Sequence, residues 1–451
     1  MDQRFAIHNL HHEGIEQFLE NDPDLRRLAR LGSQFESPLI QNFPVDTPGI
    51  YILSGGRQVG KTTLLKQWMK RLLVTQVVTP NQIAFISGDI IDDYHQLLRI
   101  CQSYLEPDTR ILIVDEVTYI REWDRAIKFL ADTGALERIS VMLSGSDSGV
   151  LSEARSRFPG RRGMSDRQDF ELLPLSFRQC VALKLPQLTE YSDDVLEEQW
   201  EEYLLHGGYL TAINQYVDAQ KIPVATLATY SDWIRGDFLK RNKNENTLME
   251  VVTSLLQRLG SQITWNALAK SLSIEHPATL ASYVEMLSTM SVVVVQSALD
   301  QNKLRAAPKK AKKIHVVDPF IYHALYNWIR PSNAPFEEQM TKAISDQLVA
   351  SLLAESVAVS HANRRSKAYY IKADGEVGIA LIQDKSFTPI EVKWTSSMRK
   401  KDLKQISKYP NGQIWSKSRA PKIGELVNTF LPRALYEFEM YTRRQSSCPV
   451  R

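Results

Sequence analysis

The chain has 451 residues, of which 43% are hydrophobic and 24% charged, and its formal net charge is +3. This length exceeds what one ordinary core needs, so two or three domains are expected. The near-neutral charge excludes a polycation that binds nucleic acid over its whole surface. Only local clusters of Lys and Arg are left for that purpose.

The cysteines and the apolar runs bear on metal binding and location. Cys101, Cys180 and Cys448 lie far apart without CxxC spacing, which argues against a zinc site or a disulfide framework and fits a reducing compartment. No apolar run reaches the roughly 18 residues that span a bilayer, and the first residues lack the pattern of a secretion signal. We therefore expect a cytoplasmic protein without a membrane partner.

The first half of the chain predicts a parallel sheet. Residues 1–48 read as helical and then irregular, with a helix that begins at Asp22-Pro23. The runs "IYILS", "IAFISGD", "RILIVDE" and "RISVMLSGS" then alternate with helical patterns such as "TLLKQWMKRLL" and "WDRAIKFLAD". Fully apolar strands that alternate with helices are typical of an α/β sheet covered on both faces.

The second half changes character twice. Residues from about 190 to 290 read as helices, and "SVVVVQSALD" returns to strand. A further change comes near Pro331 and Pro335, after which the helix "EEQMTKAISDQLVASLLAES" leads into the strands "AYYIKA", "VGIALI" and "FTPIEVKW". These changes predict further domains after the parallel sheet.

The stretch "GGRQVGKT" carries the pattern G-x-x-x-x-G-K-[ST] between an apolar strand and a helix. Its backbone N–H groups and the start of the helix would surround phosphates, so ATP is the expected ligand. Lys61 would reach the β- and γ-phosphates, and the Thr62 hydroxyl would bind Mg²⁺. The residues expected to bind ATP are Gly55, Gly56, Arg57, Gln58, Val59, Gly60, Lys61, Thr62 and Thr63.

The run "RILIVDEVTYI" provides the second half of this site. Asp115 ends a buried strand, where ligands of open α/β sheets gather, and it would hold the magnesium shell. Glu116 would orient and deprotonate the attacking water, which favours ATP hydrolysis. In "SGSDS", Ser144 and Ser146 are candidates for a contact with the γ-phosphate or the water, although such residues also simply end strands.

These motifs, together with "FPGRRG", "LLPLSF", "LLHGGYLTAI" and "IHVVDPFIYHAL", resemble a bacterial and archaeal family of AAA-type ATPases with a C-terminal half of unknown function. The resemblance implies a P-loop domain, then a helical and winged-helix region, then a small α/β domain like that of restriction endonucleases. The expected divisions are 1–48, an N-terminal helical segment; 49–180, the ATPase; 181–245, a helical lid or linker; 246–330, the winged helix; and 331–440, a degenerate nuclease-like domain.

The resemblance also implies an arginine finger and hence a homo-oligomer. Arg161 or Arg162 in "PGRRG" would reach the nucleotide of a neighbouring subunit and stabilise charge on its γ-phosphate. The alternative is a solvated basic loop.

DNA binding is expected to come from backbone contacts rather than from base readout. Residues 276–290, the second helix of the expected winged helix, contain no Lys or Arg, so that helix is poorly suited to reading bases. A basic cluster follows, and it would either grip phosphates or form a solvated hairpin tip. The cluster consists of Lys303, Arg305, Lys309, Lys310, Lys312 and Lys313.

The nuclease-like end lacks one expected ligand. Glu391 and Lys393 in "PIEVKW" share one strand face, as a magnesium-dependent nuclease requires. The family pattern E-V-D on the preceding strand is Glu376-Val377-Gly378 here, and Asp346 stands where the family usually has a glutamate. Rescue by Glu376 would displace the ligand by roughly 6–7 Å, which is too far for Mg²⁺.

The sequence therefore predicts an ATP-binding, ATP-hydrolysing AAA-type protein whose nucleotide state controls a C-terminal half that binds DNA or a protein. One alternative is an ATP-regulated nuclease that uses Glu391 and Lys393. Another is a slow ATPase switch that acts through protein contacts.

Overall fold

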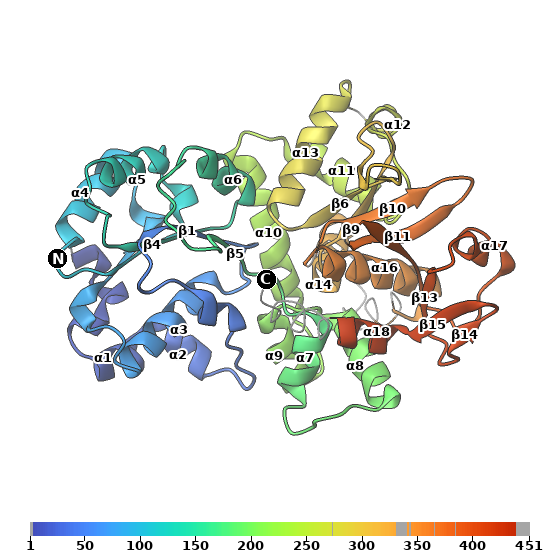
Figure 1. Cartoon of the computed structure of the whole chain (residues 1–451), viewed down its shortest axis with the longest axis horizontal. Helices are drawn as coiled ribbons and strands as arrows, with labels where there is room; N and C mark the ends of the chain where they lie inside the picture. The colour runs from blue at the N-terminus through green and yellow to red at the C-terminus, as the bar shows by residue number, and fades with distance from the viewer. Residues whose placement is uncertain are drawn as a thin grey trace. The chain divides into compact units, whose positions relative to one another are not determined.

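The structure is a computed structural model, and it describes residues 3–438 apart from 273, 331–340, 342–343, 365 and 384 (Figure 1). The chain forms two compact units, Met1–Leu173 and Pro174–Arg451. Cys448, the boundary expected near Pro331 and Pro335, and part of the helix predicted around them lie outside the described residues. In the described ranges, no helix has both the length and the apolar character that a bilayer crossing requires.

The first unit is built on a five-stranded parallel sheet in the order β2-β3-β4-β1-β5. Its strands are β1 (Gly49–Ser54), β2 (Ile83–Ser87), β3 (Ile111–Asp115), β4 (Ser140–Gly145) and β5 (Asp169–Glu171). Its helices are α1 (Ile15–Asn21), α2 (Pro23–Ala29), α3 (Lys61–Val74), α4 (Tyr94–Tyr104), α5 (Trp123–Asp132) and α6 (Ser148–Ser156). The predicted α/β fold is confirmed, and α2 begins at Pro23 behind its cap Asp22.

Helices cover both faces of this sheet, which is why its strands read as unbroken apolar runs. Ile50 and Ile52 of β1 pack in one core with residues of α4 and α5. Tyr51 and Leu53 of the same strand pack in a second core with residues of α3. Successive side chains of a strand point to opposite faces, so β1 holds its following loop firmly from both sides.

The N-terminal segment, for which the sequence suggested no role, covers the edge strand β2. The Asn9 amide donates to the Phe85 carbonyl at 2.7 Å and accepts from the Phe85 N–H at 3.0 Å. The His11 ring lies 3.0 Å from the Ile83 carbonyl. These side chains satisfy backbone groups that an edge strand otherwise leaves unpaired.

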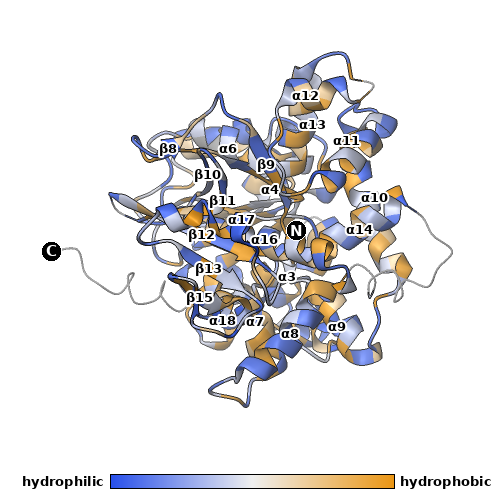
Figure 2. Ribbon diagram, turned by 90° about the vertical axis from the view of Figure 1, so that its right-hand side faces the viewer, coloured by the Kyte–Doolittle hydropathy of each residue, from blue (hydrophilic) through white to orange (hydrophobic). Residues whose placement is uncertain are grey.

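The second unit begins with helices. These are α7 (Phe177–Lys184), α8 (Asp193–His206), α9 (Leu210–Ala219), α10 (Val224–Lys240), α11 (Glu245–Gln257), α12 (Trp265–Lys270), α13 (Pro277–Thr289) and α14 (Pro319–Ile329). In Figure 2, α9 and α10 alternate hydrophilic and hydrophobic segments along their turns. The buried residues of α10, among them Leu227, Ile234 and Phe238, recur at helical spacing, as expected for a helix with one buried face.

Two small antiparallel pairs separate α13 from α14. Strand β6 (Val293–Ser297) pairs with β9 (Lys312–Val316), and β7 (Leu299–Asp300) pairs with β8 (Arg305–Ala306). An isolated antiparallel bridge pairs Ile263, before α12, with Lys312 of β9. Two helices followed by a strand, α12, α13 and β6, occur in the predicted order, and the assignment of this region as a winged helix stays a prediction.

The C-terminal part is a mixed sheet in the order β10-β11-β12-β13-β15-β14. Its strands are β10 (Ala368–Lys372), β11 (Glu376–Gln383), β12 (Ser386–Lys393), β13 (Gln413–Ser416), β14 (Lys422–Ile423) and β15 (Leu426–Phe430). Its helices are α16 (Gln347–Asn363), α17 (Lys400–Leu403) and α18 (Leu431–Phe438). A helical region followed by a mixed sheet is the fold class that the sequence predicted.

Candidate nucleotide site

The phosphate loop joins the end of β1 to the first turn of α3. Gly60 has φ +94°, and Gln58 also adopts a positive φ of +58°, so the backbone turns sharply before the helix. A Cβ at Gly55 would lie 2.3 Å from the carbonyl oxygen of Leu172, so only glycine fits there. The loop thus has the form in which backbone N–H groups surround an anion.

Lys61 lies folded over this loop. Its Nζ donates to the carbonyl oxygens of Gly55 and Gly56, both at 3.1 Å, and lies 3.4 Å from Glu116 Oε1. The residue is buried. The ammonium is therefore held where it could be transferred from carbonyl oxygens to phosphate oxygens.

Asp115 is the centre of a hydrogen-bond network at the end of β3. The Thr62 hydroxyl donates to its Oδ2 at 2.6 Å, and the Ser144 hydroxyl donates to its Oδ1. Burial raises the pKa of Asp115, Glu116 raises it further, and the two hydroxyl donors oppose both effects. The carboxylate is thus held from two sides by hydroxyl donors of α3 and β4.

Glu116 has an unusual backbone and a free carboxylate oxygen. Its φ is +50°, and its N–H donates to Ser144 Oγ at 3.2 Å. Its Oε2 is buried and has no hydrogen-bond partner among the described residues. A buried acceptor without a partner is costly, so this oxygen points to a function such as holding a water.

The strand order explains how Ser144 reaches this network. Strand β4 lies between β1 and β3, so the end of β4 stands between the phosphate loop and the carboxylates. Both Ser144 and Ser146 are buried, but the hydrogen bond to Asp115 comes from Ser144. The sequence named both serines as candidates, and without the strand order it could not separate them.

The donors present suit ATP and magnesium. Thr62 and Asp115 offer a hydroxyl and a carboxylate, the hard oxygen ligands that Mg²⁺ takes. The predicted ATP-binding residues form one continuous loop and helix start, and Arg57 lies with its guanidinium 5.4 Å from the centre of the Tyr119 ring. The loop, Lys61, Thr62, Asp115 and Glu116 are therefore brought together at the carboxyl ends of β1 and β3.

Arg161 and Arg162 lie away from this group. Arg162 forms a salt bridge with Asp169 and also lies 3.4 Å, through its Nε, from the carbonyl oxygen of Ile50, at the opposite end of β1 from the loop. Arg161 forms an ion pair with Asp132. Within one chain, both guanidiniums are engaged by carboxylates and neither contacts the phosphate loop.

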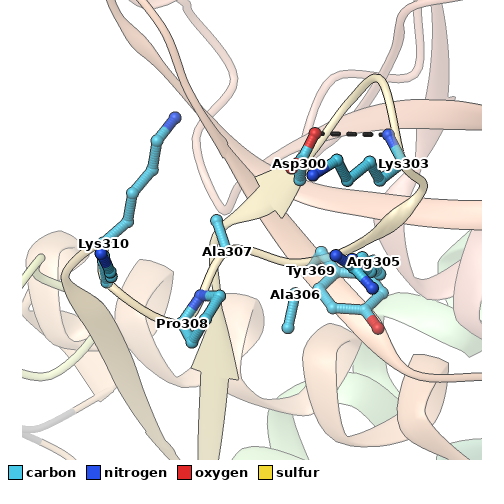
Figure 3. Close-up of a pocket in the computed structure, with 9 residues that line it drawn as sticks. Asp300, Lys303, Arg305, Ala306, Ala307, Pro308, Lys310 and Tyr369 are labelled. Atoms are coloured by element: carbon cyan, nitrogen blue, oxygen red, sulfur yellow. Dashed lines mark hydrogen bonds between the residues drawn. The ribbon is translucent and has the colours of Figure 1, made fainter.

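The basic cluster predicted to bind DNA is divided. Lys303, Arg305, Lys309 and Lys310 are exposed and line a hollow of about 820 Å³. In Figure 3, Arg305 lies beside the ring of Tyr369.

The expectation for Lys313 is wrong. Its side chain is 1% exposed and ion-paired with Glu355 and Glu376, so it cannot contact a phosphate backbone. Lys312 is half-buried, and its Nζ lies 3.4 Å from Ser297 Oγ.

The nuclease-like residues are also placed differently from expectation. Asp346 caps the N-terminus of α16 by accepting from the Leu348 N–H at 2.9 Å, and it is exposed. The buried carboxylate of that helix is Glu355, which the sequence analysis missed. A lone acid within the apolar run "LVASLLAESVAVS" was the signal that could have found it.

Comparison with known proteins agrees with this geometry. Residues 47–181 match the AAA domain family, and residues 197–332 match a domain of unknown function, DUF8612. The chain is similar to an uncharacterized protein of Haemophilus influenzae, at 20% identity over 257 residues that are 54% of this chain and 60% of that protein. It is similar to an uncharacterized protein of Methanocaldococcus jannaschii, at 24% identity over 238 residues that are 51% of this chain and 50% of that protein.

The chain thus spans about half to three-fifths of the length of these curated relatives. Among solved structures it is similar to the Walker-type ATPase of Pyrococcus abyssi, with a TM-score of 0.43, 14% identity, and coverage of 61% of this chain and 90% of that one. It is also similar to the ORC2 protein of Aeropyrum pernix, with a TM-score of 0.36, 13% identity, and coverage of 67% and 93%. Residues 47–181 are therefore similar to AAA domains, and the matched segment that follows them is similar to a domain of unknown function.

Proposed function

We propose that the protein binds ATP with Mg²⁺, hydrolyses the ATP, and uses its nucleotide state to control a C-terminal half that binds a partner. The observation that supports this most directly is that Lys61, Thr62, Asp115 and Glu116 contact one another at the carboxyl ends of β1 and β3. Ligands of open α/β sheets bind at such ends. A glycine-rich turn with only a structural role would not require this set of side chains.

Each residue of the group has a distinct role in the proposal. Lys61 would exchange its carbonyl partners for β- and γ-phosphate oxygens, because a negatively charged acceptor holds an ammonium more strongly. Thr62 and Asp115 would hold Mg²⁺, which when bound supplies positive charge to the phosphates. The free Oε2 of Glu116 would accept a proton from the attacking water.

ATP turnover by the purified full-length chain tests the proposal. Lys61→Ala should lose nucleotide binding and turnover. Glu116→Gln should keep nucleotide binding and lose about a hundredfold or more in turnover, since it removes the base and keeps the shape. Lys70→Ala, which removes an exposed lysine from the same helix, is the matched control and should behave as wild type. Equal turnover by wild type and Glu116→Gln would contradict the proposal.

DNA is the second candidate partner. The support comes from the exposed segment 303–310 between β7 and β9, which we call the wing. Lys303, Arg305, Lys309 and Lys310 surround one hollow, whereas α13 carries no Lys or Arg. Such a surface would hold phosphates and would not read bases. Binding should then be similar for unrelated sequences and should weaken steeply as salt is added.

Charge removal on the wing tests this candidate. Changing all four wing cations to Gln should weaken duplex binding and lower the slope of its salt dependence by about one unit for each phosphate that is no longer neutralised. Changing Lys400, Lys401, Lys404 and Lys422 to Gln, four lysines that are exposed elsewhere on the same unit, is the control for total charge. If DNA stimulates ATP turnover in wild type but not in the wing variant, DNA binding at the wing is coupled to ATP hydrolysis in the first unit. Turnover that ignores DNA would favour the slow switch that acts through protein contacts.

A further inference from the structure

A buried ion-pair cluster joins two parts of the second unit. Lys313 Nζ, on β9, lies 2.6 Å from Glu355 Oε1 of α16 and 2.7 Å from Glu376 Oε1 of β11. The Lys313 side chain is 1% exposed, and that of Glu355 is 9% exposed. Two carboxylates of the nuclease-like sheet region are thus neutralised by a lysine that belongs to the preceding winged-helix-like region.

This cluster lies where the nuclease-like fold lacks its ligand. A Cβ at Gly378 would lie 3.0 Å from Glu355 Oε1 and 3.9 Å from Glu391 Oε2. The Gly378 N–H donates to Glu391 Oε2 at 3.2 Å. An aspartate at 378 would therefore stand between two carboxylates, which is the oxygen-rich arrangement that Mg²⁺ requires.

In this chain that arrangement is incomplete and already has a positive charge beside it. The third carboxylate is absent, and the Lys313 ammonium uses two of its three N–H donors on Glu355 and Glu376. Lys393 Nζ lies 3.5 Å from Glu391 Oε1. In the part of the chain that the structure describes, no three His, Cys, Asp or Glu side chains are grouped as metal ligands would be.

The charge states agree with a bound ammonium. Burial alone would lower the pKa of Lys313, but Glu355 and Glu376 outweigh it, and the pKa is raised. Burial would raise the pKa of Glu355, yet Lys313 is the main reason that it is lowered instead. Glu391, where burial dominates, has its pKa raised to about 7, which makes it a weak ligand for a cation at neutral pH.

Other polar contacts connect the same two surfaces. Gln262 donates to Glu376 Oε2 at 2.6 Å. Gln296 of β6 is buried, and its Nε2 donates to the carbonyl oxygens of Tyr369 and Gly378, both at 3.0 Å. Gln296 thus reaches the same glycine that replaces the metal ligand. The winged-helix strands pack directly over the position that a nuclease would keep open for its metal and substrate.

We propose that Lys313 is a built-in counter-ion that replaces a divalent cation in the nuclease-like domain and fixes the winged-helix-like region to it. The former metal position is then a docking site within the chain, and the domain does not cut DNA. The buried carboxylate of Glu355 needs a nearby positive charge, and Lys313 of β9 provides it without metal while it also pairs with the partly exposed Glu376.

Removing the lysine tests the proposal through cation rescue. Full-length Lys313→Ala, kept free of nucleotide, should unfold at a lower temperature than wild type, because it leaves the buried Glu355 carboxylate without a counter-ion beside the partly exposed Glu376. Mn²⁺ alone should raise the unfolding temperature of Lys313→Ala, since the carboxylates can then accept the ion. Wild type should show no such response.

Lys312→Ala is the matched control, because it removes a half-buried lysine from the adjacent position of the same strand. It should unfold as wild type does and should not respond to Mn²⁺. Adding Glu355→Gln to Lys313→Ala should abolish the Mn²⁺ response and recover part of the lost unfolding temperature, since one unpaired buried charge is gone.

Three results would overturn the proposal. They are an unchanged unfolding temperature in Lys313→Ala, a Mn²⁺ response of wild type that Glu355→Gln removes, and plasmid cleavage by wild type with Mn²⁺ that Lys393→Ala abolishes. If Lys313→Ala does not fold, Lys313→Ala with Glu355→Gln must fold, because the uncompensated charge is reduced. Failure of both variants to fold would also overturn the proposal.

Discussion

The Thr62 hydroxyl donates to Asp115 Oδ2 at 2.6 Å, which joins the first turn of α3 to the end of β3. Because the hydroxyl gives its only proton to Asp115, its lone pairs remain available for a cation. The bond therefore aligns both proposed magnesium ligands in advance. The second oxygen of Asp115 accepts from Ser144, so the carboxylate has little freedom to turn away.

Removing the Thr62 hydroxyl should raise the magnesium requirement of ATP turnover. Thr62→Ala loses one proposed ligand and the group that orients the other, so the Mg²⁺ concentration for half-maximal turnover should rise at least about tenfold. Thr62→Ser keeps the hydroxyl and should stay near wild type. Turnover measured over a range of Mg²⁺ concentrations decides, and an unchanged requirement in Thr62→Ala would exclude Thr62 as a ligand.

Ser144 and Ser146 should differ although they stand two residues apart. Ser144 donates to Asp115 and accepts from the Glu116 N–H, so Ser144→Ala should lower kcat by about tenfold to a hundredfold through misplacement of both carboxylates. Ser146→Ala should have a smaller effect. Steady-state kinetics of the two variants measure this difference, with nucleotide binding measured separately. If Ser146 held the γ-phosphate or the water, Ser146→Ala would lose more kcat than Ser144→Ala.

The proposed arginine finger can be tested by mixing subunits. Arg161 and Arg162 are paired with Asp132 and Asp169 in their own chain, so either would have to leave its carboxylate to act on a neighbour. If one does, an inactive Lys61→Ala chain mixed with an inactive Arg161→Ala or Arg162→Ala chain should regain turnover, because one interface then has both groups. If the mixtures stay inactive although the chains associate, neither arginine acts on a neighbouring nucleotide, and their role is structural.

Local pattern was enough to predict the phosphate loop and the end of β3. The loop motif has fixed spacing, and the apolar run before Asp115 defines a buried strand whose end must lie at the ligand edge of the sheet. Ser144 could not be separated from Ser146, because the contact depends on β4 lying between β1 and β3. That order is a long-range property that no local pattern contains.

The nuclease-like end shows where sequence reasoning was insufficient. Six basic residues from 303 to 313 form one cluster in the sequence, but successive side chains of a strand face opposite ways, so β9 buries Lys313 while Lys312 stays half-exposed. The sequence suggested Asp346 rather than Glu355 as the acid of this helix. Glu355 was missed because its partner, Lys313, lies 42 residues away in sequence. The predicted domain divisions stay predictions; the contacts of the chain separate two units at Leu173 and Pro174.

The N-terminal segment should stabilise the ATPase unit through one buried ion pair. Lys66 of α3 lies 3.0 Å from Asp22 Oδ2, with both side chains fully buried, and donates to the His8 carbonyl at 2.7 Å. Asp22→Asn keeps an oxygen to cap α2 but leaves Lys66 without its carboxylate, so the free energy of unfolding should fall by about 3–5 kcal/mol. Urea unfolding measures it, with the exposed Glu20→Gln as control; a loss below about 1 kcal/mol would contradict this prediction.

Asp318 should make the second unit less stable as pH rises towards neutrality. Its two oxygens accept from the N–H groups of Gly208 and Phe320, at 2.8 and 2.9 Å, and burial raises its pKa from 3.8 to about 7. Between these values the folded state keeps a proton that the unfolded state has lost. The free energy of unfolding should therefore fall by about 1.4 kcal/mol per pH unit from pH 4 to 7 on account of this group.

Asp318→Asn cannot titrate, so its stability, measured by urea unfolding at several pH values, should lack this slope even if it loses one hydrogen bond. The exposed Glu285→Gln should keep the wild-type slope. If Asp318→Asn keeps it too, the carboxyl group is ionised in the folded protein and its backbone donors outweigh its burial.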